Sequence, residues 1–212
     1  SKCFVCKERR PAYSGLPLFT DEAIMSAVLK PAHSASHFRI ETFDAPLGAQ
    51  VLGLDLAQPL SLGDFQRLHH AHLDHHVLVF REQHITPQQQ VDFSRRFGPL
   101  QIHVLRQFQL PTQPEVLIIS NIVENGQPIG LGDAGHFWHS DLSYKEVPSL
   151  GSMLHAQELP DEGGDTVFAN MHLAWESLPA ALRHAVRGAR AEHSYLSQYE
   201  ELRRRNPWRP AL

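Results

Sequence analysis

The stretch between residues 77 and 98 constrains the fold most strongly, because it joins a short apolar run to a helix with a marked start. The run Val77-Leu78-Val79-Phe80 is rich in valine and predicts a buried strand. Thr86, Pro87 and Gln89 then suit the N-cap, N1 and N3 positions of a helix, and Gly98 ends it. The sequence therefore predicts a buried strand and a capped helix in close succession.

The rest of the chain adds short strands in the middle and helices at the flanks. Ser61 and Asp64 resemble a capping box, and the apolar spacing that follows predicts a helix to about His76. We further predict extended segments at 38–43, 48–54, 116–120, 139–144, 150–157, 166–169 and 187–195, and helices at 173–178 and 179–186. A glycine-rich loop is expected from Asn125 to Gly135. This order favours an α+β fold or a mainly β sandwich that carries helices.

Composition excludes several classes of partner. The chain has 212 residues of which 42% are apolar, enough for one domain with a core, alone or with an appendage. Lysine and arginine total 19 against 23 acids, so the formal charge is 19 − 23 = −4, and no basic stripe predicts a nucleic-acid surface. No apolar run approaches the roughly 18 residues of a membrane span, and no signal sequence is evident. The cytoplasm is therefore the expected location.

Residues 1–37 differ from the rest of the chain. Prolines and glycines interrupt them, and Asp21–Leu29 is the one run that resembles a helix. Cys3 and Cys6 form a C-x-x-C pair without the second ligand pair of a zinc site or the βαβ setting of a redox motif. We interpret residues 1–37 as a loosely attached extension and residues 38–212 as the domain proper.

His139 and Asp141, in the stretch FWHSDLSY, are the strongest candidate for a chemical site. On a strand, side chains two positions apart lie on the same face, so the imidazole and the carboxylate would converge. This donor pair suits a divalent first-row metal, whereas an ordinary surface strand with polar positions is the alternative. A second H-x-D, His72 and Asp74, lies in a predicted helix, where positions two apart diverge and cannot share a metal.

A longer stretch carries a family resemblance. The run WHSDLSYKEVPSLGSMLHAQELPDEGGDTVFANMHLAWESLP closely resembles the TauD/TfdA family of Fe(II)- and 2-oxoglutarate-dependent dioxygenases. The segments LGAQVLGLDLAQPLS, VLVFREQHITPQQQVDFSRRFGPLQIH and RGARAEHSY fit the same pattern in the same order. The resemblance runs from about residue 38 to residue 195. It implies a double-stranded β-helix, or jelly roll, with flanking helices.

The resemblance also implies roles for individual residues. His139 and Asp141 would be two of the three protein ligands of Fe(II), and the Thr166 hydroxyl would bind a carboxylate of 2-oxoglutarate. His103 matches a histidine that contacts the substrate anion, and Arg106 would bind that anion if it faced the same pocket. The alternatives are a β-branched strand residue for Thr166 and a solvated loop residue for Arg106. Trp138 and Tyr144 are expected to pack around the site.

Two departures from the family pattern bear on function. Arg106 and Gly135 stand where the taurine enzyme has a tyrosine and an asparagine, so taurine itself is not the expected substrate. The family places its second metal histidine and its 2-oxoglutarate arginine beyond the equivalent of Tyr195, and neither has a matching position before Leu212. Residues 203–205 are better explained as an exposed helical face. We therefore expect a C-terminally incomplete jelly roll.

The function that follows is a dioxygenase that hydroxylates a small anionic substrate, a sulfonate, sulfate ester or carboxylate. Fe(II) would be the cofactor, and 2-oxoglutarate and O2 the co-substrates, with release of succinate and CO2. The first alternative is a non-catalytic family member that binds a small anion or a partner. The second is a zinc hydrolase built on His139, Asp141 and a later histidine, which the lack of an H-E-x-x-H helix disfavours. Assembly into a homo-oligomer stays open.

Overall fold

A computed structural model describes the backbone of residues 2–7 and the whole of residues 38–135, 137–209 and 211. The strands are β1 Lys2–Lys7, β2 Arg39–Thr42, β3 Ala49–Leu52, β4 Val77–Arg81, β5 Gln109–Leu110, β6 Gln113–Leu117, β7 Val123–Glu124, β8 Gln127–Pro128 and β9 Gly151–His155. The helices are α1 Leu62–His75, α2 Pro87–Arg95, α3 Met171–Glu176, α4 Ala180–Val186 and α5 Tyr195–Arg205, with the 3₁₀ helix η3 at Arg106–Phe108. None of the described helices is long and apolar enough to cross a membrane.

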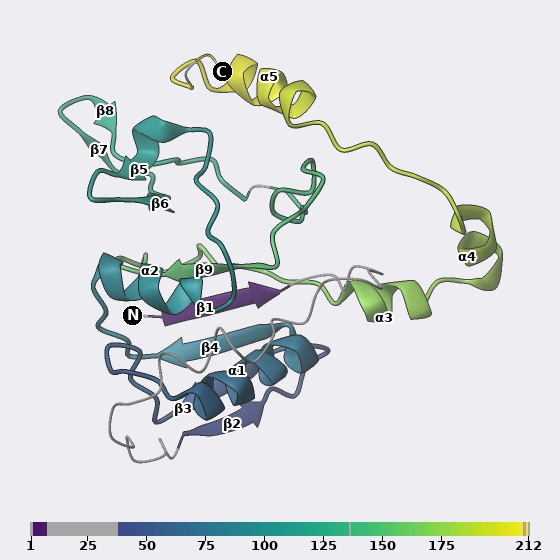
Figure 1. The fold of residues 1–212 in the computed structure, drawn as a ribbon. Coiled ribbons are helices and arrows are strands. Elements are labelled where there is room, and N and C mark those ends of the chain that lie inside the picture. The colour runs from purple at the N-terminus through teal and green to yellow at the C-terminus, as the bar shows by residue number, and fades with distance from the viewer. Residues whose placement is uncertain (1, 8–37, 136, 210, 212) are drawn as a thin grey trace.

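The largest sheet has the strand order β2-β3-β4-β1-β9 (Figure 1). Strands β3 and β4 pair in parallel, and the other neighbours pair antiparallel. Leu78 and Phe80 of β4 point to the face that α1 and α2 cover, where Leu68 and Phe93 complete the main core. Because successive side chains of a strand alternate between faces, the opposite face is left to other elements.

The predicted helix starts in this layer are confirmed. The Ser61 side chain accepts a hydrogen bond from the backbone N–H of Asp64 and caps α1. The Thr86 side chain accepts from the N–H of Gln89 at 3.2 Å, and the Gln89 side chain accepts from the N–H of Thr86 at 2.8 Å. The buried strand is confirmed as β4, and the strand expected at 150–157 as β9.

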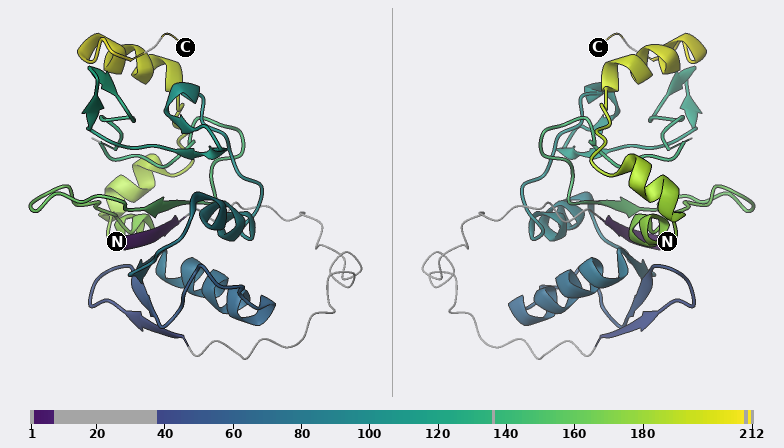
Figure 2. Two further views of the ribbon diagram at one scale, coloured as in Figure 1. Left: turned by 90° about the vertical axis from the view of Figure 1, so that its left-hand side faces the viewer. Right: turned by 90° about the vertical axis from the view of Figure 1, so that its right-hand side faces the viewer.

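A second, smaller core lies at the other end of the molecule (Figure 2). The β5–β6 and β7–β8 pairs form two small sheets there, and α5 packs over them. Buried Leu105, Phe108 and Leu131 meet Tyr199 of α5. Asp133 and Arg209 form a buried ion pair that fixes the residues after α5, with side chains 8% and 3% exposed.

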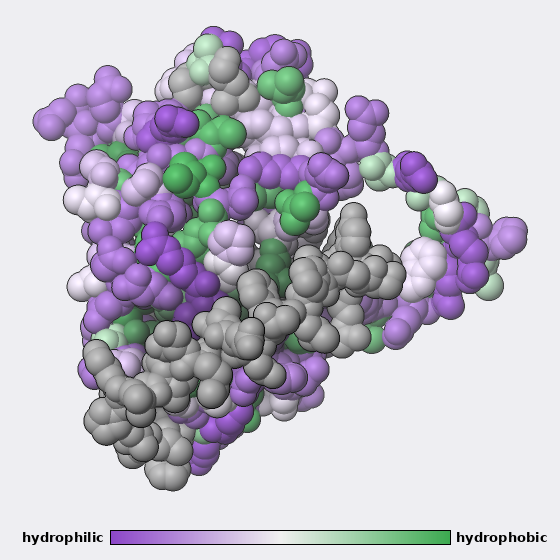
Figure 3. Space-filling model, in the orientation of Figure 1, coloured by the Kyte–Doolittle hydropathy of each residue, from purple (hydrophilic) through white to green (hydrophobic). Residues whose placement is uncertain are grey.

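Helices α3 and α4 form an arm that extends from the end of the sheet (Figure 1). The Asn170 side chain caps α3 and also donates to the carbonyl of Pro46 at 2.8 Å. Leu173 and Leu182 remain exposed on the arm, and Figure 3 shows that it stands away from the body on the viewed face. Arg203–Arg205 are exposed on α5, as the sequence predicted.

Several sequence-based expectations differ from the structure. Lys2–Lys7, assigned to a loosely attached extension, forms a strand between β4 and β9. The expected helix at 21–29 lies outside the described residues, as do the side chains of Cys3 and Cys6. The division of the chain at residue 38 stays a prediction.

Apart from residues 139–144, which are described with the candidate site, three predicted strands in the second half are wrong in place or in type. The strand expected at 116–120 is instead β6 at Gln113–Leu117. Residues 166–169 form no strand, and residues 187–194 form no strand before α5 begins. The described strands form one mixed sheet and two small ones, so the α+β arrangement with flanking helices is present. Two facing sheets of a jelly roll are not formed among these residues.

The Asp133–Arg209 pair gives a test of what holds α5 in place. Both groups are buried, and Asp133 accepts from Arg209 Nε at 2.8 Å and from Asn206 Nδ2 at 2.6 Å. We expect Asp133→Asn to lower the free energy of unfolding by about 3 kcal/mol, because it leaves the buried guanidinium without its counter-charge. Urea unfolding of the wild type, of Asp133→Asn and of a control variant measures the free energy of unfolding.

The matched control is Asp92→Asn. It removes the charge of an exposed carboxylate whose Oδ1 lies 3.6 Å from Nη1 of Arg95. Exposed pairs of this kind contribute little, so the control should change stability by less than about 0.5 kcal/mol. Equal effects of the two substitutions would contradict the assignment of the Asp133–Arg209 pair as the anchor of α5.

Candidate metal centre

The backbone around the H-x-D motif is a turn and not a strand. The strand predicted at 139–144 is therefore wrong. Ser143 N–H donates to the carbonyl of Ser140 at 3.3 Å, and Leu142 has a positive φ of 53°. A positive φ confined to the third residue is typical of a type II turn. The turn runs from Ser140 to Ser143, so Asp141 takes its second position and His139 directly precedes it.

His139 and Asp141 converge within this turn. His139 Nε2 lies 3.2 Å from Asp141 Oδ1, and the two side chains are 40% and 49% exposed. On the other side of the ring, His139 Nδ1 lies 2.8 Å from the carbonyl oxygen of Phe137, which can only accept a hydrogen bond. The second carboxylate oxygen, Asp141 Oδ2, accepts a hydrogen bond from Ser152 Oγ on β9. Each polar atom of the pair therefore has a defined partner.

The electrostatics of the pair follow from these contacts. The hydrogen bond to Asp141 raises the pKa of His139, and that same hydrogen bond lowers the pKa of Asp141. Burial opposes both shifts, and Ser152 adds to the lowering of the Asp141 pKa. Both ring nitrogens of His139 face acceptors, so a protonated imidazolium satisfies both. A metal ion at Nε2 would replace that proton and leave the Nδ1–H donated to Phe137, the usual support of a metal-binding histidine.

The donor atoms fit two ligand positions of one ion. An imidazole nitrogen and a carboxylate oxygen suit a divalent first-row metal. Two donors at right angles, each about 2.1 Å from one ion, lie about 3 Å apart. The observed 3.2 Å between Nε2 and Oδ1 is close to this separation. Within the described part of the chain, no group of three or more His, Cys, Asp or Glu side chains is placed to hold a metal.

His103 lies in the electrostatic field of this pair. Burial lowers the pKa of its imidazole, and the Asp141 carboxylate acts in the opposite direction. The backbone N–H of Leu105 donates to His103 Nδ1 at 3.2 Å, so the neutral ring carries its proton on Nε2. The ring of Tyr195 lies edge-on at 6.4 Å. His103 is thus a half-buried, neutral hydrogen-bond donor beside the candidate centre.

The structure does not join Thr166 or Arg106 to this group. Thr166 is exposed, in a segment without regular structure. Arg106 is exposed at the start of η3. The cations that act on the pKa of His103 are instead Arg209 and Lys145, and both lower it. The roles expected for Thr166 and Arg106 stay predictions.

An aromatic layer on α5 adjoins the centre. Tyr144, which was expected to pack, has its ring centroid 4.8 Å from that of Tyr195. The ring centroids of Tyr195 and Tyr199 lie 5.5 Å apart. Burial raises the pKa of Tyr195 to about 12, so its phenol stays protonated. Trp138 was also expected to pack, but it is 70% exposed, which corrects that prediction.

Sequence reasoning missed Ser152, Tyr195 and Arg209 as neighbours of the site. Ser152 lies in a strand that was predicted, and the alternation of that strand was the one signal that could have placed it on this face. The contacts of Tyr195 and Arg209 depend on how α5 packs. No local pattern encodes that packing.

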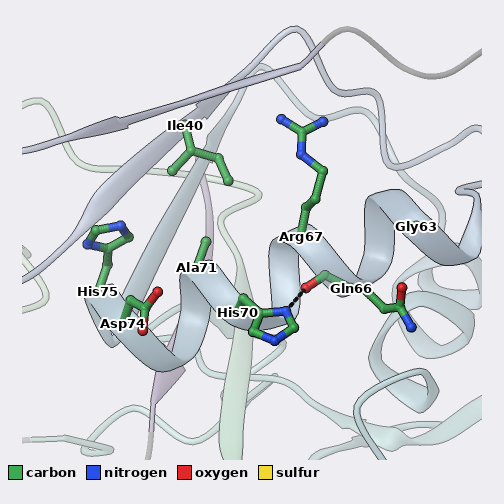
Figure 4. Close-up of a pocket in the computed structure, with 8 residues that line it drawn as sticks. All are labelled: Ile40, Gly63, Gln66, Arg67, His70, Ala71, Asp74 and His75. Atoms are coloured by element: carbon green, nitrogen blue, oxygen red, sulfur yellow. Dashed lines mark hydrogen bonds between the residues drawn. The ribbon is translucent and has the colours of Figure 1, made fainter.

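A pocket lies elsewhere, along α1 beside Ile40 of β2 (Figure 4). Its lining residues are Ile40, Gly63, Gln66, Arg67, His70, Ala71, Asp74 and His75. His70 Nδ1 bonds to the carbonyl of Gln66 at 2.7 Å, and Arg67 is paired with Asp64 at 3.6 Å. None of the five predicted site residues lines this pocket. His72 is buried while Asp74 lines the pocket, so the second H-x-D diverges on the helix as predicted.

The pairing of His139 with Asp141 predicts a specific titration. In the metal-free chain the ion pair is present at pH values between the lowered pKa of Asp141 and the raised pKa of His139. It is lost when the pH rises through the pKa of His139, because the imidazole then loses its charge. Asp141→Asn should therefore lower the pKa of His139, because the largest cause of the shift is removed. NMR titration of the imidazole ring protons, assigned with a His139→Gln spectrum, measures this. An unchanged His139 pKa in Asp141→Asn, with exposed Asp161→Asn as control, would show that the two side chains are not paired.

Comparisons with known proteins place these residues in a family context. Pentalenolactone F synthase of Streptomyces avermitilis is 40% identical over 161 residues, which cover 74% of this chain and 52% of that protein. The alpha-ketoglutarate-dependent 2,4-dichlorophenoxyacetate dioxygenase of Cupriavidus pinatubonensis is 34% identical over 185 residues, covering 82% and 60%. The crystal structure of a taurine dioxygenase from Burkholderia xenovorans superposes with a TM-score of 0.58 at 30% identity, covering 70% and 50%. The chain thus spans about half the length of the relatives it matches.

The model of the family described as "Taurine catabolism dioxygenase TauD, TfdA family" matches residues 39–211, which include the whole turn with His139 and Asp141. The relative from Cupriavidus is by name an alpha-ketoglutarate-dependent dioxygenase, and the solved neighbour is by title a taurine dioxygenase. From the extent of the family match, the chain belongs to the TauD/TfdA family of dioxygenases.

Proposed function

We propose that the chain provides the metal-binding core of an Fe(II)- and 2-oxoglutarate-dependent dioxygenase that hydroxylates a small anionic substrate. The observation that carries the proposal is the 3.2 Å approach of His139 Nε2 to Asp141 Oδ1 within a family-matched segment. Both are ligand types of the 2-His-1-carboxylate site of non-haem iron oxygenases. When bound, iron supplies the activation of O2 that couples decarboxylation of 2-oxoglutarate, to succinate and CO2, with oxidation of a C–H bond.

The protein's own groups have distinct tasks in this proposal. Phe137 fixes the orientation of the His139 ring through its carbonyl, and Asp141 contributes a negative charge that offsets part of the charge of the ion. The Thr166 hydroxyl is proposed to donate to a carboxylate of 2-oxoglutarate. That role requires the exposed segment around Thr166 to move against the metal centre when the co-substrate binds.

The proposed substrate class rests on the polar groups next to the pair. Because its Nδ1 accepts from the Leu105 N–H, the neutral His103 ring carries its proton on Nε2, which can donate a hydrogen bond to an anion. Arg209 and Lys145 add positive potential at His103, and the exposed Arg106 is proposed to bind the same anion. The names of relatives are consistent with a carboxylate or sulfonate, since one acts on 2,4-dichlorophenoxyacetate and one solved neighbour is a taurine dioxygenase.

The proposal is tested by anaerobic titration of the chain with Fe(II) in the presence of 2-oxoglutarate. Chelation of the keto acid by bound iron gives a weak visible charge-transfer band. We expect this band in the wild-type chain and its loss in His139→Ala, with Fe(II) affinity weakened by more than about 100-fold, since a direct ligand matters more than a supporting residue.

The control is His184→Ala, which removes an exposed histidine of α4 and should leave the band unchanged. A wild-type chain that gives no band, or a His139→Ala variant that keeps it, would contradict the proposed site. Loss of the band in both variants would indicate general instability, which circular dichroism of the two proteins would reveal.

A further inference from the structure

Strand β9 places one serine against the candidate metal centre. Ser152 Oγ donates a hydrogen bond to Asp141 Oδ2, and Ser152 is half-buried. We propose that Ser152 is a positioning residue that holds the Asp141 carboxylate so that only Oδ1 faces the metal, an inference that rests on the proposed iron site.

The argument begins with the two oxygens of the carboxylate. Oδ1 lies 3.2 Å from His139 Nε2, on the side where the two donor atoms converge. Oδ2 is occupied by the Ser152 hydroxyl, which must be the donor because an ionised carboxylate has no proton to give. With Oδ2 engaged, Asp141 offers one oxygen and not two to an ion beside His139. A single-oxygen carboxylate leaves one more coordination position for co-substrates than a two-oxygen one.

The second step is the rigidity of the element that carries Ser152. Strand β9 pairs along its length with β1, where Ser152 lies opposite Cys6 in the backbone register. The next residue, Met153, points to the other face of the sheet and contacts α2, since Ser94 Oγ lies 3.3 Å from its sulfur. Gln90 Nε2 also donates to the Met153 carbonyl at 3.4 Å. Because Met153 is fixed on the helix face, alternation fixes Ser152 on the face of the metal centre.

The third step is the contrast between this strand and the turn that carries Asp141. The turn belongs to no strand or helix, and Leu142 adopts a positive φ that residues other than glycine rarely adopt. Sites carried by strands hold their geometry more closely than sites carried by loops. The hydrogen bond from the Ser152 hydroxyl therefore restrains the Asp141 carboxylate, which lies in a turn, against a strand that the sheet holds in place. Removing it should let the carboxylate rotate, while the turn and the sheet both remain folded.

The experiment compares Ser152→Ala with Ser152→Thr, which keeps the hydroxyl and suits a strand. Ser140→Ala is the matched control, because it removes an exposed hydroxyl beside both proposed ligands. Anaerobic titration with Mn(II), followed by the electron paramagnetic resonance signal of the free ion, measures affinity. Visible absorption of bound Co(II) reports coordination number, and thermal unfolding of the metal-free proteins reports folding.

We expect Ser152→Ala to weaken Mn(II) binding about 10- to 100-fold, as loss of a residue that supports a metal ligand typically does. Its Co(II) spectrum should change in shape, whereas Ser152→Thr and Ser140→Ala should match the wild type and all should unfold at similar temperatures. A Ser152→Ala chain that binds like the wild type, or a Ser152→Thr chain as weak as Ser152→Ala, overturns the role of Ser152. A wild-type chain that binds neither ion overturns the proposed function and this role with it.

Discussion

The carboxylate of Asp141 is the point on which the candidate centre depends, because both of its oxygens are engaged and each bond comes from a different element. The Nε2 atom of His139, two residues earlier in the chain, lies next to Oδ1. Ser152 of β9 donates to Oδ2. The turn that makes this possible forces Leu142 to a φ of 53°, which costs on the order of 1–3 kcal/mol for a residue with a side chain. Strain of this kind persists only where surrounding contacts determine the conformation, and here it coincides with the chemistry.

The second core links stability to the environment of the site. Asp133 and Arg209 anchor the chain after α5, and α5 in turn carries Tyr195 to His103 and Tyr144. Burial of His103, whose ring lies edge-on to that of Tyr195, lowers its pKa although the charge of Asp141 acts in the opposite direction. The ion pair thus borders the centre through the α5 rings and the charge of Arg209 at His103, and it does not contact the proposed metal ligands.

Local signals in the sequence were sufficient for elements that depend on neighbours along the chain. The Thr86 cap and the β4 strand were predicted correctly, because a capping box and an apolar run act within a few residues. The place of Lys2–Lys7 between β4 and β9 was not, since strand pairing over such separations leaves no local pattern. The strand expected at 116–120 is observed at Gln113–Leu117, which we attribute to tertiary contacts.

The approach of His139 to Asp141 was predicted correctly, but from the wrong backbone geometry. The argument for convergence of His139 and Asp141 assumed a strand, whereas a turn with a left-handed residue brings them together. A leucine gives no sequence signal for positive φ, which glycine or asparagine would have given. Ser152 was overlooked because a serine within an apolar strand has many explanations. The roles of Thr166 and Arg106 rest on resemblance alone, since both residues are exposed and neither forms a described hydrogen bond or ion pair with His139 or Asp141.

A crystal structure of the chain grown with Mn(II) and N-oxalylglycine, which replaces a methylene of 2-oxoglutarate by N–H, tests the central claim most directly. The account predicts one Mn(II) bound by His139 Nε2 and Asp141 Oδ1, with Ser152 Oγ still on Asp141 Oδ2 and the oxalyl group on the ion. A metal held instead by the histidines of α1, or by both oxygens of Asp141 with Ser152 displaced, would contradict it.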